Sequence, residues 1–98
     1  MLHVSQMIKS FNDRRLKRLY ERGDGSRIAP DMADKIENIL GVLDRAGRIE
    51  AMNLPGFRLH PLRGDLAGFW SVTVRANWRV IFRFEDGNAF DVGLIDYH

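Results

Sequence analysis

The sequence has no cysteine, only three prolines and no long apolar run. Without cysteine, the chain has no disulfide framework, no thiol nucleophile and no thiolate ligand for a metal. Its three histidines are also a poor supply for a structural zinc site, which requires four ligands. No apolar segment approaches the roughly 20 residues of a membrane-spanning helix. We therefore expect neither a disulfide-stabilised domain nor a metal-stabilised one, and no membrane partner.

The length and composition are those of a single globular domain. The chain has 98 residues, of which 45% are hydrophobic and 29% charged. Those fractions argue against disorder, and the length leaves no room for a second domain, so we expect residues 1–98 to fold as one unit. Residues 1–7 lack the apolar stretch of a signal peptide, which favours a cytoplasmic protein.

Lysine is also scarce, because twelve of the fifteen basic residues are arginine. The net charge is only +2, but residues 9–27 carry seven basic side chains against three acidic ones. The guanidinium group presents a planar fork of donors that matches a phosphate. This segment therefore indicates a polyanionic partner, and the alternative is a solvated helix face of no special function.

The first half of the chain predicts a short strand and two helices. Residues 7–11 alternate between apolar and polar, as a strand does. Asn12 or Asp13 can then cap a helix of about ten residues that ends at Gly23. A second helix is expected from Pro30 to about residue 46, and a short turn of helix at residues 48–53.

The second half has the period of two that is typical of β-strands. We expect strands at 57–60, 69–75, 78–84 and 90–95, the last two joined at an Asp86-Gly87 hairpin signal. The order β-α-α-β-β-β-β favours an α+β fold, with two helices packed on one face of a small, mostly antiparallel sheet. The other face of the sheet is expected to be open.

Alternation predicts which side chains that open face would carry. It places arginines there together with one imidazole, and the residues expected on it are Arg58, His60, Ser71, Thr73, Arg75, Arg79, Ile81 and Arg83. Each one alone is most simply a solvated surface residue. Several cations near a histidine nevertheless suggest a site for a phosphate.

These residues and the end of the chain together could cleave a phosphodiester. Cleavage requires a base, an acid and cations that stabilise the phosphate as charge builds on it. The imidazoles of His60 and His98 can act as base or acid near neutral pH. RNA supplies its own nucleophile, the 2′-hydroxyl, and Tyr97 could stack on a base.

Three segments resemble the HigB toxins of the RelE superfamily. They are residues 59–65, which include His60-Pro61-Leu62, residues 68–80, and the terminal Asp96-Tyr97-His98. Residues 7–11 are similar to the usual start of the family, so the resemblance covers 7–98 and leaves 1–6 as an N-terminal extension.

The resemblance implies a RelE-like microbial RNase fold and the toxin of a bacterial type II toxin–antitoxin system. Such toxins enter the ribosomal A site and cut the mRNA there, without a metal or another cofactor. The partner that it implies is a HigA antitoxin, a helix-turn-helix protein. The alternative function is a non-catalytic RNA- or ribosome-binding module that blocks translation by occupancy.

The resemblance also assigns roles to particular residues. It implies that the active site holds His60, Asp96, Tyr97 and His98. Arg63, where a family lysine often stands, and Arg79 would stabilise the scissile phosphate. His60 or Asp96 would accept the 2′-hydroxyl proton and His98 would protonate the leaving oxygen, giving a 2′,3′-cyclic phosphate.

The first predicted helix has a separate expected role. Arg14, Lys17 and Arg18 lie away from its apolar stripe and could bind ribosomal RNA phosphates without reading sequence. The competing interpretation is that an acidic antitoxin surface covers them.

Overall fold

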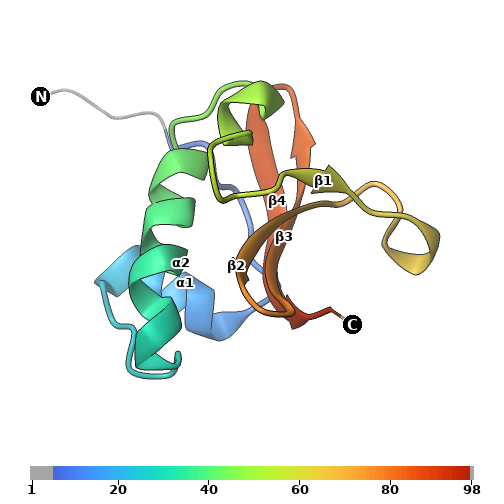
Figure 1. The fold of residues 1–98 in the computed structure, drawn as a ribbon. Coiled ribbons are helices and arrows are strands. Elements are labelled where there is room, and N and C mark those ends of the chain that lie inside the picture. The colour runs from blue at the N-terminus through green and yellow to red at the C-terminus, as the bar shows by residue number, and fades with distance from the viewer. Residues whose placement is uncertain (1–5, 98) are drawn as a thin grey trace, which may run out of the picture.

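The computed structural model describes residues 6–97 of the chain. Two helices, α1 (Arg14–Arg22) and α2 (Pro30–Leu43), precede one antiparallel sheet of four strands in the order β1-β2-β3-β4 (Figure 1). The strands are β1 (His60–Pro61), β2 (Trp70–Arg75), β3 (Trp78–Glu85) and β4 (Asn88–Asp96), and two short 3-10 helices are η1 (Ile49–Met52) and η2 (Gly64–Leu66). This confirms the predicted α+β fold. No helix in this part of the chain is long and apolar enough to cross a membrane.

Helix α1 is capped at both ends as the sequence predicts. The Asp13 carboxylate accepts hydrogen bonds from the backbone N–H groups of Arg15 (2.8 Å) and Leu16 (3.3 Å). At the other end Gly23 adopts a left-handed φ of 69° and its N–H donates to the Leu19 carbonyl. These two caps satisfy backbone groups that the helix itself leaves unpaired.

Helix α2 begins at Pro30 as predicted but ends earlier than expected, at Leu43. After Leu43 the backbone hydrogen bonds tighten to three-residue spacing, from the N–H of Arg45 to Val42 and from that of Ala46 to Leu43. Helix ends often tighten in this way, so the apolar pattern extends beyond the α-helix proper.

Asp44, just after α2, joins three parts of the fold. Its Oδ1 atom accepts hydrogen bonds from the N–H groups of Met7 (3.0 Å) and Ile8 (3.2 Å) and from the Tyr20 hydroxyl (2.8 Å). Burial and this hydrogen bond raise the pKa of Tyr20 well above its usual value. The contact therefore fixes the N-terminal segment and α1 against the end of α2.

The segment 7–11 pairs with β4 but forms no continuous strand, contrary to the prediction. It meets β4 in parallel at two isolated bridges, Ile8 to Ala89 and Phe11 to Val92. Between them Asp91 has a φ of 53°, and the β3–β4 register shifts at this point. The bulge at Asp91 interrupts the edge against which a regular strand would pair.

The core lies between the helices and one face of the sheet. Figure 1 shows both helices on the same side of the strands. Val72, Val80 and Phe82 from the sheet are fully buried, together with Ile36 and Leu43 from α2. The three strand residues alternate along β2 and β3 with residues that the sequence placed on the open face.

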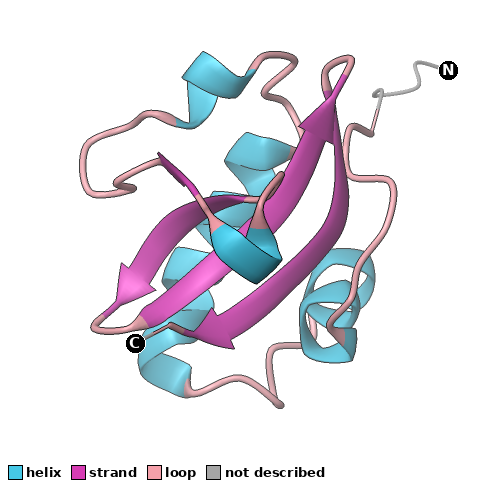
Figure 2. Cartoon of the chain, turned by 90° about the vertical axis from the view of Figure 1, so that its right-hand side faces the viewer, coloured by secondary structure: helices cyan, strands magenta, loops and turns pink. Residues whose placement is uncertain are grey.

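The opposite face is partly covered rather than open. The connection 62–69, with η2, projects from β1 away from the helices and stands in front of the sheet (Figures 1 and 2). Ser71 and Ile81, predicted to be exposed here, are only 3% and 6% accessible, as is Leu62 at 6%. The connection therefore accounts for the low accessibility of this part of the face.

Two predicted features of the strands are wrong for the same kind of reason. Arg75 does not lie on the expected face, because the β2–β3 register shifts between Thr73 and Arg75 and its guanidinium pairs with Asp31 of α2. The expected strand 57–60 is reduced to β1, because Arg58 has a left-handed φ of 51°. Such irregularities change which face a side chain occupies, and alternation alone does not reveal them.

Candidate active site

An open hollow of about 400 Å³ lies on the sheet face opposite the helices. It is lined by Arg58, Leu59, His60, Ser71, Thr73, Arg79 and Tyr97. The hollow thus brings together His60, Arg79 and Tyr97, three of the predicted site residues, from segments far apart in the sequence.

The strand register explains why these side chains meet. His60 lies opposite Ser71 in the β1–β2 pair, and Thr73 lies opposite Arg79 in the β2–β3 pair. Residues two apart on a strand share a face, so Ser71 and Thr73 form the floor of the hollow between His60 and Arg79. Val72 between them faces the core.

Backbone carbonyl groups at the β2–β3 turn accept hydrogen bonds from Arg79 and Tyr97. The Arg79 Nη1 atom donates to the carbonyl oxygens of Ala76 (2.7 Å) and Trp78 (3.3 Å). The backbone N–H of Tyr97 donates to the Asn77 carbonyl at 2.8 Å. Tyr97 is 42% exposed, so it is available to a ligand.

The charge of the hollow suits an anion. Two arginines, Arg58 and Arg79, line it together with His60, and none of its described lining residues is acidic. A phosphate could be held by the guanidinium forks while the imidazole exchanges a proton with a neighbouring hydroxyl. The Tyr97 ring adds a surface on which a base could stack.

Two other predicted residues, Arg63 and Asp96, do not line this hollow, and a third lies outside the described part of the chain. Arg63 is exposed on the projecting connection just before η2. Asp96 ends β4, where it pairs with Trp78. His98 lies outside the described residues.

Arg83 holds the projecting connection in place. Its guanidinium lies over the Phe69 ring, 4.4 Å from the centroid, and its Nε is 3.5 Å from an Asp91 carboxylate oxygen. Gly68 has a φ of 96°, and a Cβ there would come within 2.8 Å of the Arg83 guanidinium. A side chain at Gly68 would therefore strain the backbone and displace Arg83, which packs on the connection that carries Arg63.

Sequence reasoning missed Arg58 and Thr73 as parts of the site. Alternation placed both on this face, but neither belongs to a motif that singled it out. Only the register of β1 on β2 brings them beside His60 and Arg79.

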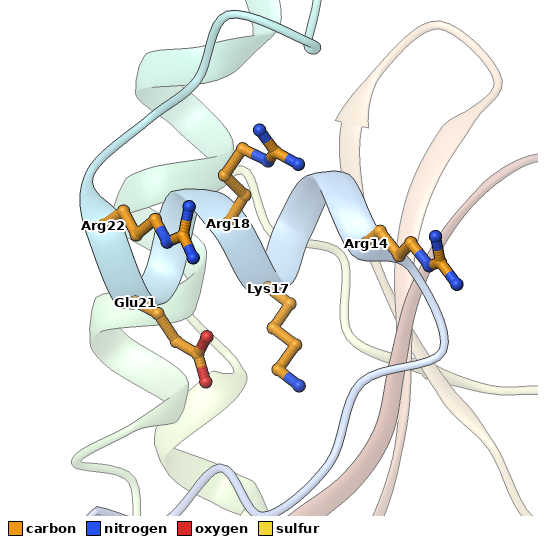
Figure 3. Close-up of a pocket in the computed structure, with 5 residues that line it drawn as sticks. All are labelled: Arg14, Lys17, Arg18, Glu21 and Arg22. Atoms are coloured by element: carbon orange, nitrogen blue, oxygen red, sulfur yellow. The ribbon is translucent and has the colours of Figure 1, made fainter.

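The predicted basic surface of α1 is present and is separate from the hollow. Figure 3 shows the side chains of Arg14, Lys17, Arg18 and Arg22 projecting along the helix, with Glu21 near Arg22 at one end. Arg14, Lys17 and Arg22 are exposed, whereas Arg18 is half-buried and lies 3.8 Å from Asp24. Because α1 packs against α2 and β4 on the helix side of the sheet, this surface and the hollow can contact a partner independently.

Among residues 6–97, no group of three or more histidine, aspartate or glutamate side chains could hold a metal ion.

Comparison with known proteins assigns the chain to a family. Residues 9–98 match the family described as the RelE-like toxin of type II toxin–antitoxin system HigB. The chain is 45% identical over 92 residues to "Endoribonuclease HigB" of Proteus vulgaris, covering 94% of this chain and 100% of that protein. It is 33% identical over 93 residues to "Toxin HigB-1" of Vibrio cholerae, covering 90% of this chain and 95% of that protein.

A solved structure shares the fold at low sequence identity. The structure titled "YoeB-YefM complex from Staphylococcus aureus" has a TM-score of 0.62 and 17% identity, covering 97% of this chain and 99% of that one.

Proposed function

We propose that this chain, which belongs to the HigB family of RelE-like toxins of type II toxin–antitoxin systems, is a ribosome-dependent endoribonuclease. It would cut mRNA in the ribosomal A site and so halt translation. The endoribonuclease activity is supported by the relative named "Endoribonuclease HigB", which matches 94% of the chain. The observation that carries the proposal is the cationic hollow in which His60, Arg79 and Tyr97 meet.

The proposed reaction is attack of the 2′-hydroxyl on the adjacent phosphorus, without a metal. A base removes the hydroxyl proton, the 2′-oxygen bonds to phosphorus, and the bond to the 5′-oxygen breaks as that oxygen gains a proton. The products are a 2′,3′-cyclic phosphate and a free 5′-hydroxyl. Cations that contact the phosphate stabilise the extra negative charge of the transition state.

His60 is the base that the geometry favours over Asp96. Its imidazole lines the hollow with Arg79, whereas Asp96 is not among the lining residues. His98, next to Tyr97 in sequence, would be the acid. Arg79 and Arg63 would contact the phosphate, and Tyr97 would position the nucleotide.

Two partners complete the proposal. The basic side chains of α1, Arg14, Lys17 and Arg18, would bind ribosomal RNA phosphates, because they are clustered on one helix and project outward (Figure 3). A HigA-type helix-turn-helix antitoxin would inhibit the toxin, as expected for a member of a toxin–antitoxin family. The protein would act in the cytoplasm, where ribosomes are.

The alternative function is a module that binds the ribosome and blocks translation by occupancy. The basic surface of α1 would serve that function equally well. It gives no reason, however, for an imidazole and a guanidinium to share one hollow. The two functions differ in whether the mRNA is cut.

Primer extension on a defined mRNA tests the proposal. The mRNA is incubated with the protein, with and without programmed ribosomes, and His98→Ala is the matched variant. We expect new 5′ ends only with ribosomes and only with the wild-type chain. Cuts on naked mRNA would reject ribosome dependence, and halted translation without cuts would favour the occupancy alternative.

A further inference from the structure

A β-bulge lies directly before His60. The N–H of Thr73 donates to the Phe57 carbonyl at 2.7 Å, while His60 pairs with Ser71. His60 is three residues after Phe57, whereas the residues opposite them, Ser71 and Thr73, are only two apart. The segment that leads into β1 therefore carries one extra residue. The extra residue is accommodated at Arg58, which has a φ of 51°.

Arginine is a poor residue for this backbone conformation. The left-handed region brings Cβ close to the backbone, so glycine is preferred there and asparagine or aspartate is tolerated. Bulges of this type usually carry glycine at the left-handed position. The arginine at this position therefore strains the backbone that a glycine would leave relaxed.

The bulge at Asp91 provides an internal comparison. Asp91 has a similar φ of 53°, but its contacts account for it. Its carboxylate accepts a hydrogen bond from the Ser10 hydroxyl (3.4 Å) and lies 3.5 Å from Arg83 Nε, and its N–H donates to the Ser10 Oγ (2.8 Å). The strained residue is stabilised there by interactions within the fold.

Arg58 has no comparable interactions. Among residues 6–97 its guanidinium makes no hydrogen bond or ion pair, and Arg58 is an exposed residue that lines the hollow. Arg79 Nη1, in contrast, donates hydrogen bonds to two backbone carbonyl oxygens. Arg58 therefore brings the hollow a cation whose donors have no partner within the described part of the chain and can bind a ligand.

We propose that Arg58 is an RNA-binding residue of the active site, aimed into the hollow by the bulge to hold a backbone phosphate beside the His60 imidazole. This inference rests on the proposed endoribonuclease function. The strain at Arg58 is then the consequence of placing a guanidinium next to the reacting group, since strained residues collect at functional sites.

The test is single-turnover cleavage of mRNA on programmed ribosomes at saturating protein, with the thermal midpoint of each variant. Arg58→Gly should slow cleavage about 10- to 100-fold, the effect of losing a hydrogen bond to a charged group. Its Tm should equal or exceed that of the wild type, because glycine relaxes the backbone. Arg58→Lys, which keeps the charge and the strain, should recover most of the rate.

Asp86→Gly is the matched control. Asp86 has a φ of 52° in the β3–β4 hairpin and does not line the hollow, so this change should leave the rate unaltered. Wild-type cleavage by Arg58→Gly, or a rate for Arg58→Lys as low as that of Arg58→Gly, would overturn the role of Arg58 alone. A wild-type chain that leaves the mRNA intact would overturn the proposed endoribonuclease as well, and the two failures are thereby distinguished.

Discussion

The hollow and the α1 surface are both cationic, but they are built differently. In the hollow, two guanidinium groups share a wall with an imidazole and an aromatic ring over a floor formed by Ser71 and Thr73. The α1 surface has four cations and one glutamate, with neither an imidazole nor an aromatic ring among them. The two regions have the same sign of charge and different chemical capacity.

This difference separates attraction from reaction. Cations alone attract phosphate at long range, and salt screens that attraction. Proton transfer requires in addition a group that titrates near neutral pH within reach of the substrate. The proposed division therefore places catalysis in the hollow and ribosome binding on α1, and the variants below test it.

The largest expected effect is that of His60→Ala. Removing a general base should slow cleavage about 100- to 10,000-fold. His60 is exposed and makes no side-chain hydrogen bond with another described residue, so Tm should remain unchanged. Cleavage rate and Tm measured on the same preparation check this. Cleavage by His60→Ala at the wild-type rate would show that His60 takes no part in catalysis.

A smaller loss is expected for Arg83→Ala. The change removes the guanidinium that packs on Phe69 and pairs with Asp91, and so loosens the connection that carries Arg63. A misplaced phosphate-binding group should lower the cleavage rate, by up to about 100-fold for a shift of about 1 Å. Arg83→Lys, which cannot stack in the same way, should also be slow. If both variants cleave normally, the connection does not contribute to the active site.

Charge reversal on α1 should affect binding and not the reaction. We expect Lys17→Glu with Arg18→Glu to weaken ribosome association and to flatten the plot of log affinity against log salt by about 1.5 units for two phosphate contacts. The control is Arg45→Glu with Arg48→Glu, which changes the net charge equally at exposed positions away from both surfaces. Ribosome affinity is measured for both double variants across a salt series. If the slopes for the two double variants are equal, α1 is an ordinary solvated helix face.

Asp13→Ala should change stability alone. Loss of this N-cap should cost about 1 kcal/mol in the free energy of unfolding, with no effect on the saturated cleavage rate. Burial raises the pKa of Asp13, but the hydrogen bonds from Arg15 and Leu16 outweigh it and leave the pKa lowered. The contribution of Asp13 is therefore complete above about pH 4 and is lost as the pH falls through the lowered pKa. Urea unfolding at pH 7 and pH 3 should show the wild type and Asp13→Ala converging at low pH. If the difference in the free energy of unfolding between the two proteins were the same at both pH values, the effect would come from packing.

The sequence predicted those parts of the fold that depend on neighbouring residues. Asp13 and Gly23 delimit α1 because a side-chain oxygen and a left-handed glycine act within one turn. Asp86-Gly87 makes a hairpin because both residues tolerate a positive φ, which they adopt here at 52° and 81°.

The features that the sequence could not predict depend on distant contacts. Ser71 and Ile81 were expected on an open face, but the connection 62–69 folds over it and buries them. Arg75 leaves that face because one extra residue changes the register. Arg58 lies on the face that alternation predicts, but its place beside His60 in the hollow depends on the register of β1 on β2, which no motif encodes.

The most direct test of the division between hollow and helix is the single-turnover cleavage rate as a function of protein concentration on programmed ribosomes. We predict that Lys17→Glu with Arg18→Glu requires more protein but reaches the wild-type rate at saturation. His60→Ala should saturate at the wild-type concentration with a rate at least about 100-fold lower. A helix variant whose saturated rate falls as far as that of His60→Ala would contradict the account, because it would place α1 in the reaction itself.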